Sequence, residues 1–204
     1  MNNAIRRITI AVACEELAAE TEFDDITIDM ICERAGISRS TFYRTFEDKY
    51  QMLLWVQNFP FDHGISKMGR SLTCQQALQA SFEGFAIFRN MFHSARNSSE
   101  RKRRENEGVE AAYQVLRQTI QDTHDIAIDK ELEMQLRWTA HSILLTAKEW
   151  TTGTHDETPV EVAQLTASCI PSRLKTILDA PPEPEPYRPL DLSLILISAR
   201  SDAN

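Results

Sequence analysis

Residues 26–54 constrain the fold most strongly, because two helix boundaries lie almost next to each other there. Thr27 and Ser38 are candidate N-caps, since their hydroxyls can accept an orphan backbone N–H. Gly36 suits the left-handed residue that ends many helices. Because one residue separates Gly36 from Ser38, the pattern predicts a helix, a tight turn and a second short helix.

The rest of the chain also favours helices over strands. Only 6 of the 204 residues are glycine, and apolar residues recur every three or four positions. An all-α fold is therefore expected, with helices over 3–20, 28–35, 39–46, 49–60, 74–96, 109–120, 130–151 and 159–177, the last kinked at Pro171. Residues 181–189 hold five prolines and should be extended, and the alternating leucines at 190–196 are strand-like.

The segment 130–151 carries two apolar stripes. One consists of Leu132, Leu136, Ile143, Ala147 and Trp150, and the other of Met134, Trp138, His141 and Leu145. A helix that is apolar on two sides should be buried on two sides. One stripe can cover its own domain, which leaves the other for a partner. With the small residues Ala163 and Ala167 in the helix that follows, this predicts a homodimer formed by the last two long helices.

The charge distribution allows only a local contact with nucleic acid. The net charge is -8, from 22 basic and 30 acidic residues, so no global basic excess exists. Residues 1–33 carry 2 basic and 8 acidic side chains, whereas residues 34–49 carry 4 basic and 2 acidic ones. A DNA-binding surface, if present, should therefore be compact and lie near 34–49.

The start of the predicted 39–46 helix has the chemistry of a DNA-recognition helix. Its small residues let the backbone approach the major groove, Arg39 can bond guanine bidentately, and the methyl of Thr41 can meet that of thymine. Tyr43 can donate to a phosphate, and Lys49 in the first turn of the next helix can hold a second one. The alternative is a helical bundle that uses the same packing without DNA. We favour DNA binding, because packing does not require these polar residues, whereas Phe42 and Phe46 should be core.

These residues form one run at fixed spacing: Thr27-Ile28-x-x-Ile31-Cys32-x-x-Ala35-Gly36-Ile37-Ser38-x-x-Thr41-Phe42-Tyr43-x-x-Phe46-x-Asp48-Lys49. The run resembles the N-terminal signature of the tetracycline-repressor (TetR/AcrR) family, with dense similarity over about 8–54. The resemblance implies a homeodomain-like, three-helix helix-turn-helix domain and a helical-bundle domain for dimerisation and ligand sensing. It also implies a homodimer on a palindromic double-stranded DNA operator. The residues expected at the DNA are Thr27, Ser38, Arg39, Ser40, Thr41, Tyr43, Arg44 and Lys49.

Two positions depart from the family pattern. Glu22 stands where the family commonly has glycine, and Thr45 stands where histidine is frequent. Arg44 is expected to replace the phosphate contact of that histidine. Repression is the sign that the resemblance implies, with activation left open.

A small-molecule effector is the third expected partner. Its candidate pocket is lined by Phe82, Phe85, Phe88, Trp138 and His141. For each of these residues, ordinary core packing is the alternative.

Other functional classes find little support. The four cysteines are far apart, and the five histidines are scattered, so no metal, cofactor or enzyme is expected. No signal peptide or membrane-spanning stretch is visible, which predicts a cytoplasmic protein.

The expected organisation is a DNA-binding domain at 1–58, a ligand-sensing and dimerisation domain at 72–180 and a proline-rich tail at 181–204. The main alternative is a regulator of the same type without a small ligand, which acts through protein partners as a co-activator. A core without a cavity would favour that alternative. A small helical enzyme is the second alternative, and it lacks a convergent polar site.

Overall fold

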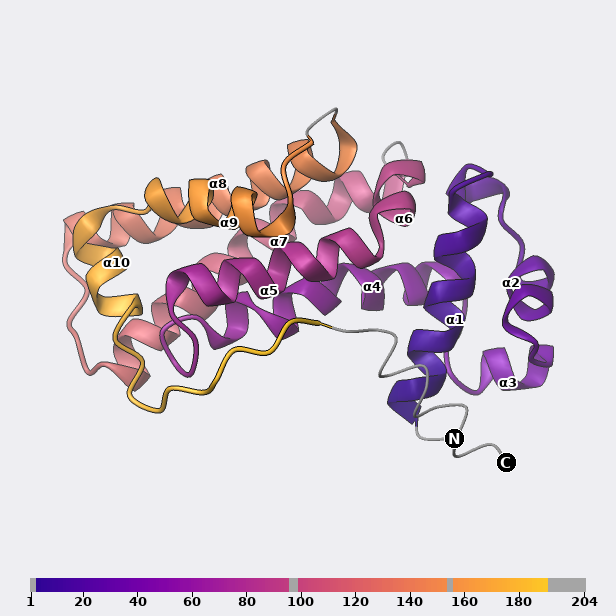
Figure 1. Ribbon diagram of the computed structural model, residues 1–204, viewed down its shortest axis with the longest axis horizontal. Coiled ribbons are helices and arrows are strands. Elements are labelled where there is room, and N and C mark those ends of the chain that lie inside the picture. Colours follow the sequence, from indigo (N-terminus) through magenta and orange to yellow (C-terminus); the bar gives the residue numbers. More distant parts are fainter. Residues whose placement is uncertain (1–2, 96–98, 154–155, 191–204) are drawn as a thin grey trace. The chain divides into compact units, whose positions relative to one another are not determined.

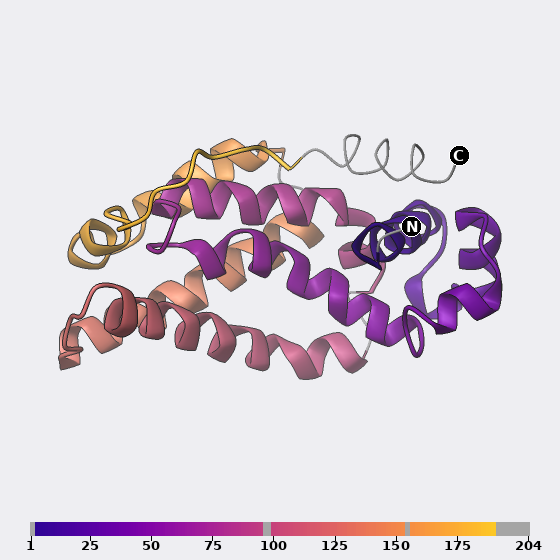
Figure 2. The same ribbon diagram turned by 90° about the horizontal axis from the view of Figure 1, so that it is seen from below.

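The computed structural model describes residues 3–95, 99–153 and 156–190, which are mainly helical (Figures 1 and 2). The α-helices in this part of the chain are α1 (Asn3–Ala18), α2 (Ile28–Ala35), α3 (Arg39–Tyr43), α4 (Lys49–His63), α5 (Cys74–Ile87), α6 (Arg89–Ser94), α7 (Ser99–Gln118), α8 (Lys130–Thr152), α9 (Pro159–Ser168) and α10 (Ser172–Leu178). Short helical turns follow α1, α4 and α7, namely η1 (Phe23–Asp25), η2 (Ile65–Lys67) and the π-helical η3 (Thr119–Thr123). The predicted all-α fold is confirmed.

The chain divides into two compact units. The described part of the first unit contains residues 3–58, 87–95, 99–102 and 190, so α6 belongs with α1, α2 and α3. The second unit contains residues 59–86 and 103–189, apart from 154–155, which lie outside the described residues. The unit boundary falls inside α4, after Asn58.

The first unit has its own apolar core. Ile10, Cys14, Phe23, Ile31, Phe42, Phe46, Met52 and Val56 are among its buried side chains. Phe42 and Phe46 are 0% and 2% exposed, which confirms that they are core residues. Their rings lie 6.1 Å apart, and Phe46 lies 6.1 Å from Trp55 of α4, so aromatic contacts connect the helices of this unit.

Several helices end at other positions than predicted. α3 stops at Tyr43 rather than 46, and α4 continues past Pro60 to His63. The helix expected over 74–96 is broken at Phe88, whose φ of -116° and ψ of 30° separate α5 from α6. The last helix is interrupted rather than kinked, because Pro171 takes an extended conformation between α9 and α10.

The second unit is built around one buried cluster. It includes Leu78, Phe82, Leu116, Leu136, Ile143, Trp150, Val162 and Leu174, which come from α5, α7, α8, α9 and α10. The first apolar stripe of α8 lies entirely in this cluster. Ala163 and Ala167 also lie there, at 0% and 4% exposed, so they pack within their own chain and are not available to a partner.

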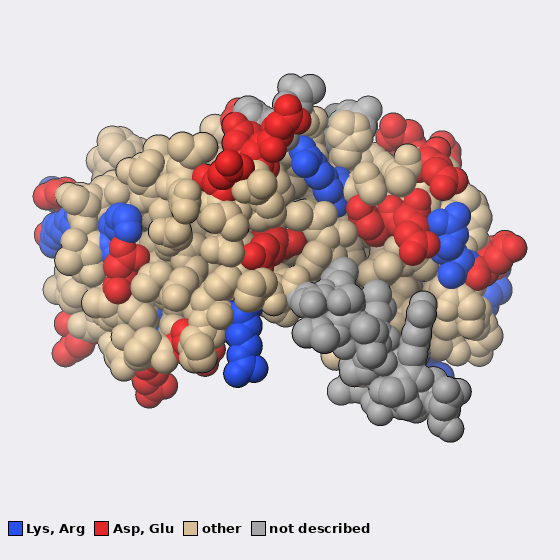
Figure 3. All heavy atoms as spheres, in the orientation of Figure 1, with Lys and Arg blue, Asp and Glu red and all other residues tan. Residues whose placement is uncertain are grey.

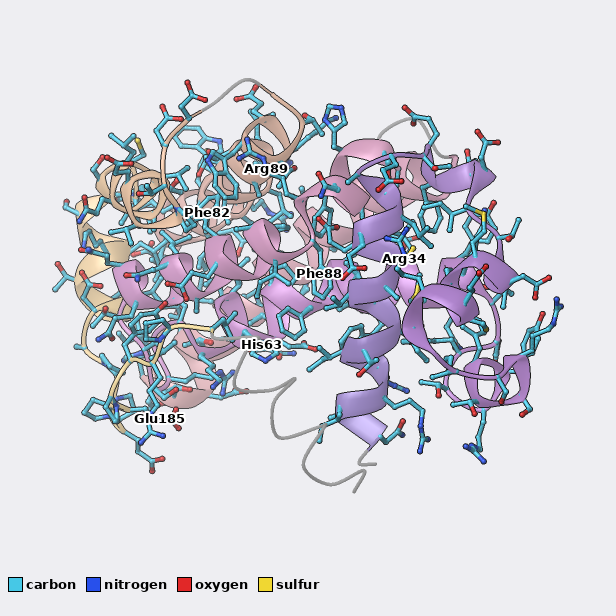
Figure 4. All side chains as sticks on the ribbon, turned by 45° about the vertical axis from the view of Figure 1, so that its right-hand side comes forward. Arg34, His63, Phe82, Phe88, Arg89 and Glu185 are labelled. Atoms are coloured by element: carbon cyan, nitrogen blue, oxygen red, sulfur yellow. The ribbon has the colours of Figure 1, made fainter. Side chains whose placement is uncertain are left out.

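The proline-rich segment after α10 is extended along the second unit, as predicted for 181–189. The backbone N–H of Glu185 donates to the carbonyl of Ser71 at 2.9 Å, and Tyr187 packs against the buried cluster. In Figures 1 and 2 this segment, coloured yellow, runs beside α5. Glu185 is labelled in Figure 4. The predicted strand-like part, 191–196, and the rest of the tail to 204 lie outside the described residues.

The helices are too short or too polar for a bilayer. Among the described residues, none has both the length and the apolar character needed to span a membrane.

Candidate nucleic-acid interface

The α2–α3 turn is built by two side-chain caps and one glycine. The hydroxyl of Thr27 accepts the N–H of Met30 at 3.3 Å, and that of Ser38 accepts the N–H of Thr41 at 3.2 Å. Gly36 has a φ of 63°, which favours glycine. The predicted helix, turn and capped short helix are therefore present, and the buried rings of Phe42 and Phe46 hold α3 against its unit.

The opposite side of α3 is polar. The hydroxyl of Ser38 also lies 2.9 Å from that of Ser40 and 3.0 Å from that of Thr41, so three small polar side chains form one cluster at the helix start. Ser38, Arg39, Ser40, Tyr43 and Arg44 are exposed, and Thr41 is half-buried. This side of α3 can meet the edges of bases and phosphate oxygens.

Arg39 is held by two neighbours on this surface. Its Nη1 donates to Oδ1 of Asp29 on α2 at 2.5 Å, and its Nη2 lies 3.4 Å from the hydroxyl of Tyr43. The hydrogen bond to Asp29 is the main reason that the pKa of Arg39 is raised further above its ordinary value. Asp29 was not among the residues expected at the DNA, because nothing local in the sequence indicates its contact with a residue ten positions away.

Lys49 bonds to the backbone of its own unit. Its Nζ donates to the carbonyl oxygens of Phe23, Asp24 and Ile26 at 3.0, 2.7 and 2.8 Å. An ammonium group has three N–H donors, so these bonds use all of them. In this structure Lys49 therefore ties the start of α4 to the segment after α1, and a phosphate contact by its side chain stays a prediction.

Thr45, which stands where histidine is frequent in the tetracycline-repressor family, has a structural role. Thr45 is 7% exposed and its hydroxyl donates to the carbonyl of Thr41 at 2.9 Å, so it stabilises the end of α3. Arg44, its neighbour, is exposed. Arg44 is thus the side chain that can take over a phosphate contact at this point.

The charged side chains on one face of the molecule do not form an extended basic surface. On the face seen in Figure 3, acidic and basic side chains are interspersed, and no broad basic patch is visible. A compact DNA contact near α3, as the charge distribution indicates, stays a prediction.

A second acid, the half-buried Glu15, was also missed by sequence reasoning. Both carboxylate oxygens of Glu15 on α1 accept backbone N–H groups, from Asn90 and Met91 at 2.8 Å each. Burial raises the pKa of Glu15 to about 7, although the two amides act in the opposite direction. Glu15 thereby connects α1 to the first turn of α6 within the first unit.

The five candidate ligand residues differ in unit and in exposure. Phe82 is fully buried, with its ring 6.2 Å from that of the half-buried Phe85, whereas Phe88 belongs to the first unit (Figure 4). Trp138 is 65% exposed and His141 is exposed as well, both on the second stripe of α8. Only Phe82 and Phe85 therefore lie together beside the second unit's core.

Comparison with known proteins links this geometry to one family. Residues 10–56 match the family model of bacterial regulatory proteins, tetR family. The chain is similar in structure to a dihydroxyacetone kinase operon activator, DhaS, with a TM-score of 0.61 and 18% identity over 82% of this chain and 97% of that one. It is also similar to a tetR-family transcriptional regulator from Streptomyces coelicolor, with a TM-score of 0.52 and 20% identity over 95% of this chain and 99% of that one. No curated protein matches the sequence at a significant level.

The matched segment and the observed helix-turn-helix agree. Residues 10–56 span α2, the Gly36 turn, α3 and about half of α1 and of α4, which together hold the capped polar surface. The two solved structures have the same helical fold. Residues 10–56 therefore carry the segment that the chain shares with bacterial regulatory proteins of the tetR family, and the fold is that of the two solved structures.

Proposed function

We propose that this regulator binds a palindromic operator as a homodimer and represses transcription until a small-molecule effector releases it. In this proposal residues 1–58 bind DNA, residues 72–180 dimerise and sense the effector, and 181–204 form a tail. A bacterial regulator of this kind meets its operator in the cytoplasm, which is the location we propose.

The observation that carries the proposal is the polar, exposed start of α3 above a fully buried Phe42. Because the buried aromatic core holds this helix in place, its first residues can contact the major groove without the helix having to become ordered on binding. We assign base contacts to Arg39, Ser40 and Thr41. Phosphate contacts are assigned to the residues around them, Thr27, Ser38, Tyr43 and Arg44.

The proposed dimer uses the exposed stripe of α8. Met134, Trp138 and Leu145 are 51%, 65% and 55% exposed, and Leu165 of α9 is 58% exposed. Large apolar side chains grouped on one helix face usually mark a protein contact. A two-fold contact through these residues would present two copies of α3 to the two halves of a palindrome.

Effector sensing is assigned to aromatic rings of the second unit. Phe82 packs edge-on against Trp150, with ring centroids 5.5 Å apart, and Phe85 lies beside it. These aromatic rings could contact an apolar effector. The alternative, a co-activator without a ligand, predicts that no metabolite changes operator affinity.

The decisive experiment is selection of bound sequences from random duplex DNA with the purified protein. Wild type should enrich a palindrome, and Arg39→Ala should lose preference at one base per half-site, at a cost of about 1–3 kcal/mol. Arg173→Ala serves as the control, because it removes the same charge from the second unit. Titrating a panel of metabolites against the complex then tests effector release.

Two outcomes would contradict these assignments. Enrichment of no sequence by wild type would argue against a specific operator. Retention of every base preference by Arg39→Ala would show that bases are read elsewhere.

A further inference from the structure

Asp29 is an unexpected residue on a surface proposed to meet DNA. It lies in the first turn of α2, and its side chain is 67% exposed. A carboxylate at this position repels the phosphates that surround every base pair. An exposed ion pair contributes little to folding stability, so the need to fold does not explain the contact with Arg39.

The geometry around Arg39 is that of an oriented guanidinium. Asp29 accepts from Nη1 on one side, and the hydroxyl of Tyr43 lies 3.4 Å from Nη2 on the other. The Tyr43 ring lies beside the guanidinium as well, with its centroid 5.9 Å from Cζ. Anchors on two different helices thus restrict a side chain that would otherwise sample many rotamers.

We propose that Asp29 is a specificity-determining residue that positions Arg39 for guanine. The carboxylate occupies one N–H of Nη1, which leaves donors on the guanidinium for the O6 and N7 acceptors of guanine. The same carboxylate repels phosphate oxygens and so keeps Arg39 from settling on the DNA backbone. Asp29 therefore weakens binding to unrelated DNA and strengthens discrimination at one base pair.

This inference rests on the proposed function, since Arg39 must read a base for Asp29 to position it. Positioning of Arg39 must be distinguished from a second role of Asp29, which is stabilisation of α2. As an acid near the positive N-terminal end of α2, Asp29 also favours that helix, and its removal would then lower stability without changing base preference. A test must therefore measure discrimination as well as affinity.

The experiment compares wild type, Asp29→Asn, Arg39→Ala and the double variant on the selected operator. A second operator carries a changed base pair at the position that Arg39→Ala relaxes, and a third duplex is unrelated in sequence. Glu33→Gln is the matched control, because it removes one exposed acid from the same helix. Circular dichroism verifies that each variant is folded.

Asp29→Asn should lower discrimination against the changed base by about tenfold. It should tighten binding to the unrelated duplex and increase the salt dependence by about one released ion per half-site, because Arg39 becomes free to contact phosphate. Glu33→Gln should keep the discrimination of wild type. In the Arg39→Ala background, Asp29→Asn should not change discrimination further.

Unchanged discrimination in a folded Asp29→Asn protein would overturn the inference while leaving the proposed function intact. Equal loss of discrimination with and without Arg39 would also overturn it, because Asp29 would then act independently. Failure of wild type to select any sequence would overturn the proposed function and this inference together.

Discussion

The α2–α3 segment and α8 distribute their apolar side chains in opposite ways. In α2–α3 the apolar Ile31 and Phe42 are buried, while the exposed positions are mostly polar. In α8 apolar residues occupy both the buried side, as at Ile143, and the exposed side, as at Trp138 and Leu145. The first surface suits water and a charged polymer, whereas the second suits another apolar protein surface. This difference supports the proposal that the two surfaces serve different partners.

The largest expected effect comes from placing a charge on each side of α8. Ile143→Glu buries an unpaired carboxylate in the second unit's core, at a cost of several kcal/mol, and should remove much of the helical circular dichroism. Leu145→Glu, two residues away, should keep the circular dichroism but sediment as a monomer. Loss of bivalent binding should then lower operator affinity by about a hundredfold or more.

A conservative change at the same exposed position provides the control. Leu145→Met preserves the apolar character and should remain a dimer with normal operator affinity. Should the Leu145→Glu protein stay dimeric, the two sides of α8 would not differ as proposed, and the subunit contact would lie elsewhere.

A smaller effect on stability should distinguish Lys49 from Arg44, an exposed cation of the first unit. Lys49→Met removes three hydrogen bonds from a charged donor to carbonyl oxygens and should lower the free energy of unfolding by about 2–3 kcal/mol. Arg44→Ala should leave stability within about 0.5 kcal/mol of wild type but weaken binding to all duplexes and reduce the salt dependence. Urea unfolding and DNA titration at several salt concentrations measure the two quantities.

This pair of variants tests whether Lys49 acts mainly in folding and Arg44 mainly in DNA binding. A stable Lys49→Met protein with weakened DNA binding would mean that Lys49 acts mainly on phosphate. The contacts with Phe23, Asp24 and Ile26 would then be of little consequence for folding.

The smallest expected effect is a pH dependence from Glu15. Its pKa is raised to about 7 from the ordinary 4.5, chiefly by burial. The folded state therefore binds this proton more tightly than the unfolded state, and the free energy of unfolding falls as pH rises through that window. Relative to Glu15→Gln, wild type should lose on the order of 2 kcal/mol between about pH 4.5 and pH 7.5. The free energy of unfolding is measured for both proteins at several pH values. The same pH dependence in the two proteins would contradict the assignment.

Much of the first unit could be predicted from the sequence, because its signals are local. Thr27, Gly36 and Ser38 act on backbone groups within four residues, so their identity alone indicates where α2 and α3 begin and where α2 ends. The same reasoning says less about exposure in α8. Trp138 and His141 are four and seven residues from Met134 on one exposed stripe, and periodicity does not say which stripe faces the core.

The contacts that give individual residues their roles depend on tertiary structure. Lys49 meets carbonyl groups 23 to 26 positions earlier, and Glu15 meets amides 75 and 76 positions later. No local pattern encodes such pairs, since they arise only when separate helices pack. The sequence by itself determined the helical class, the capped turn and the existence of two apolar stripes, through short-range hydrogen bonding and periodicity. Packing alone decided which stripe is exposed, why Lys49 turns inward and how Asp29 holds Arg39, because these depend on side chains brought together from different helices.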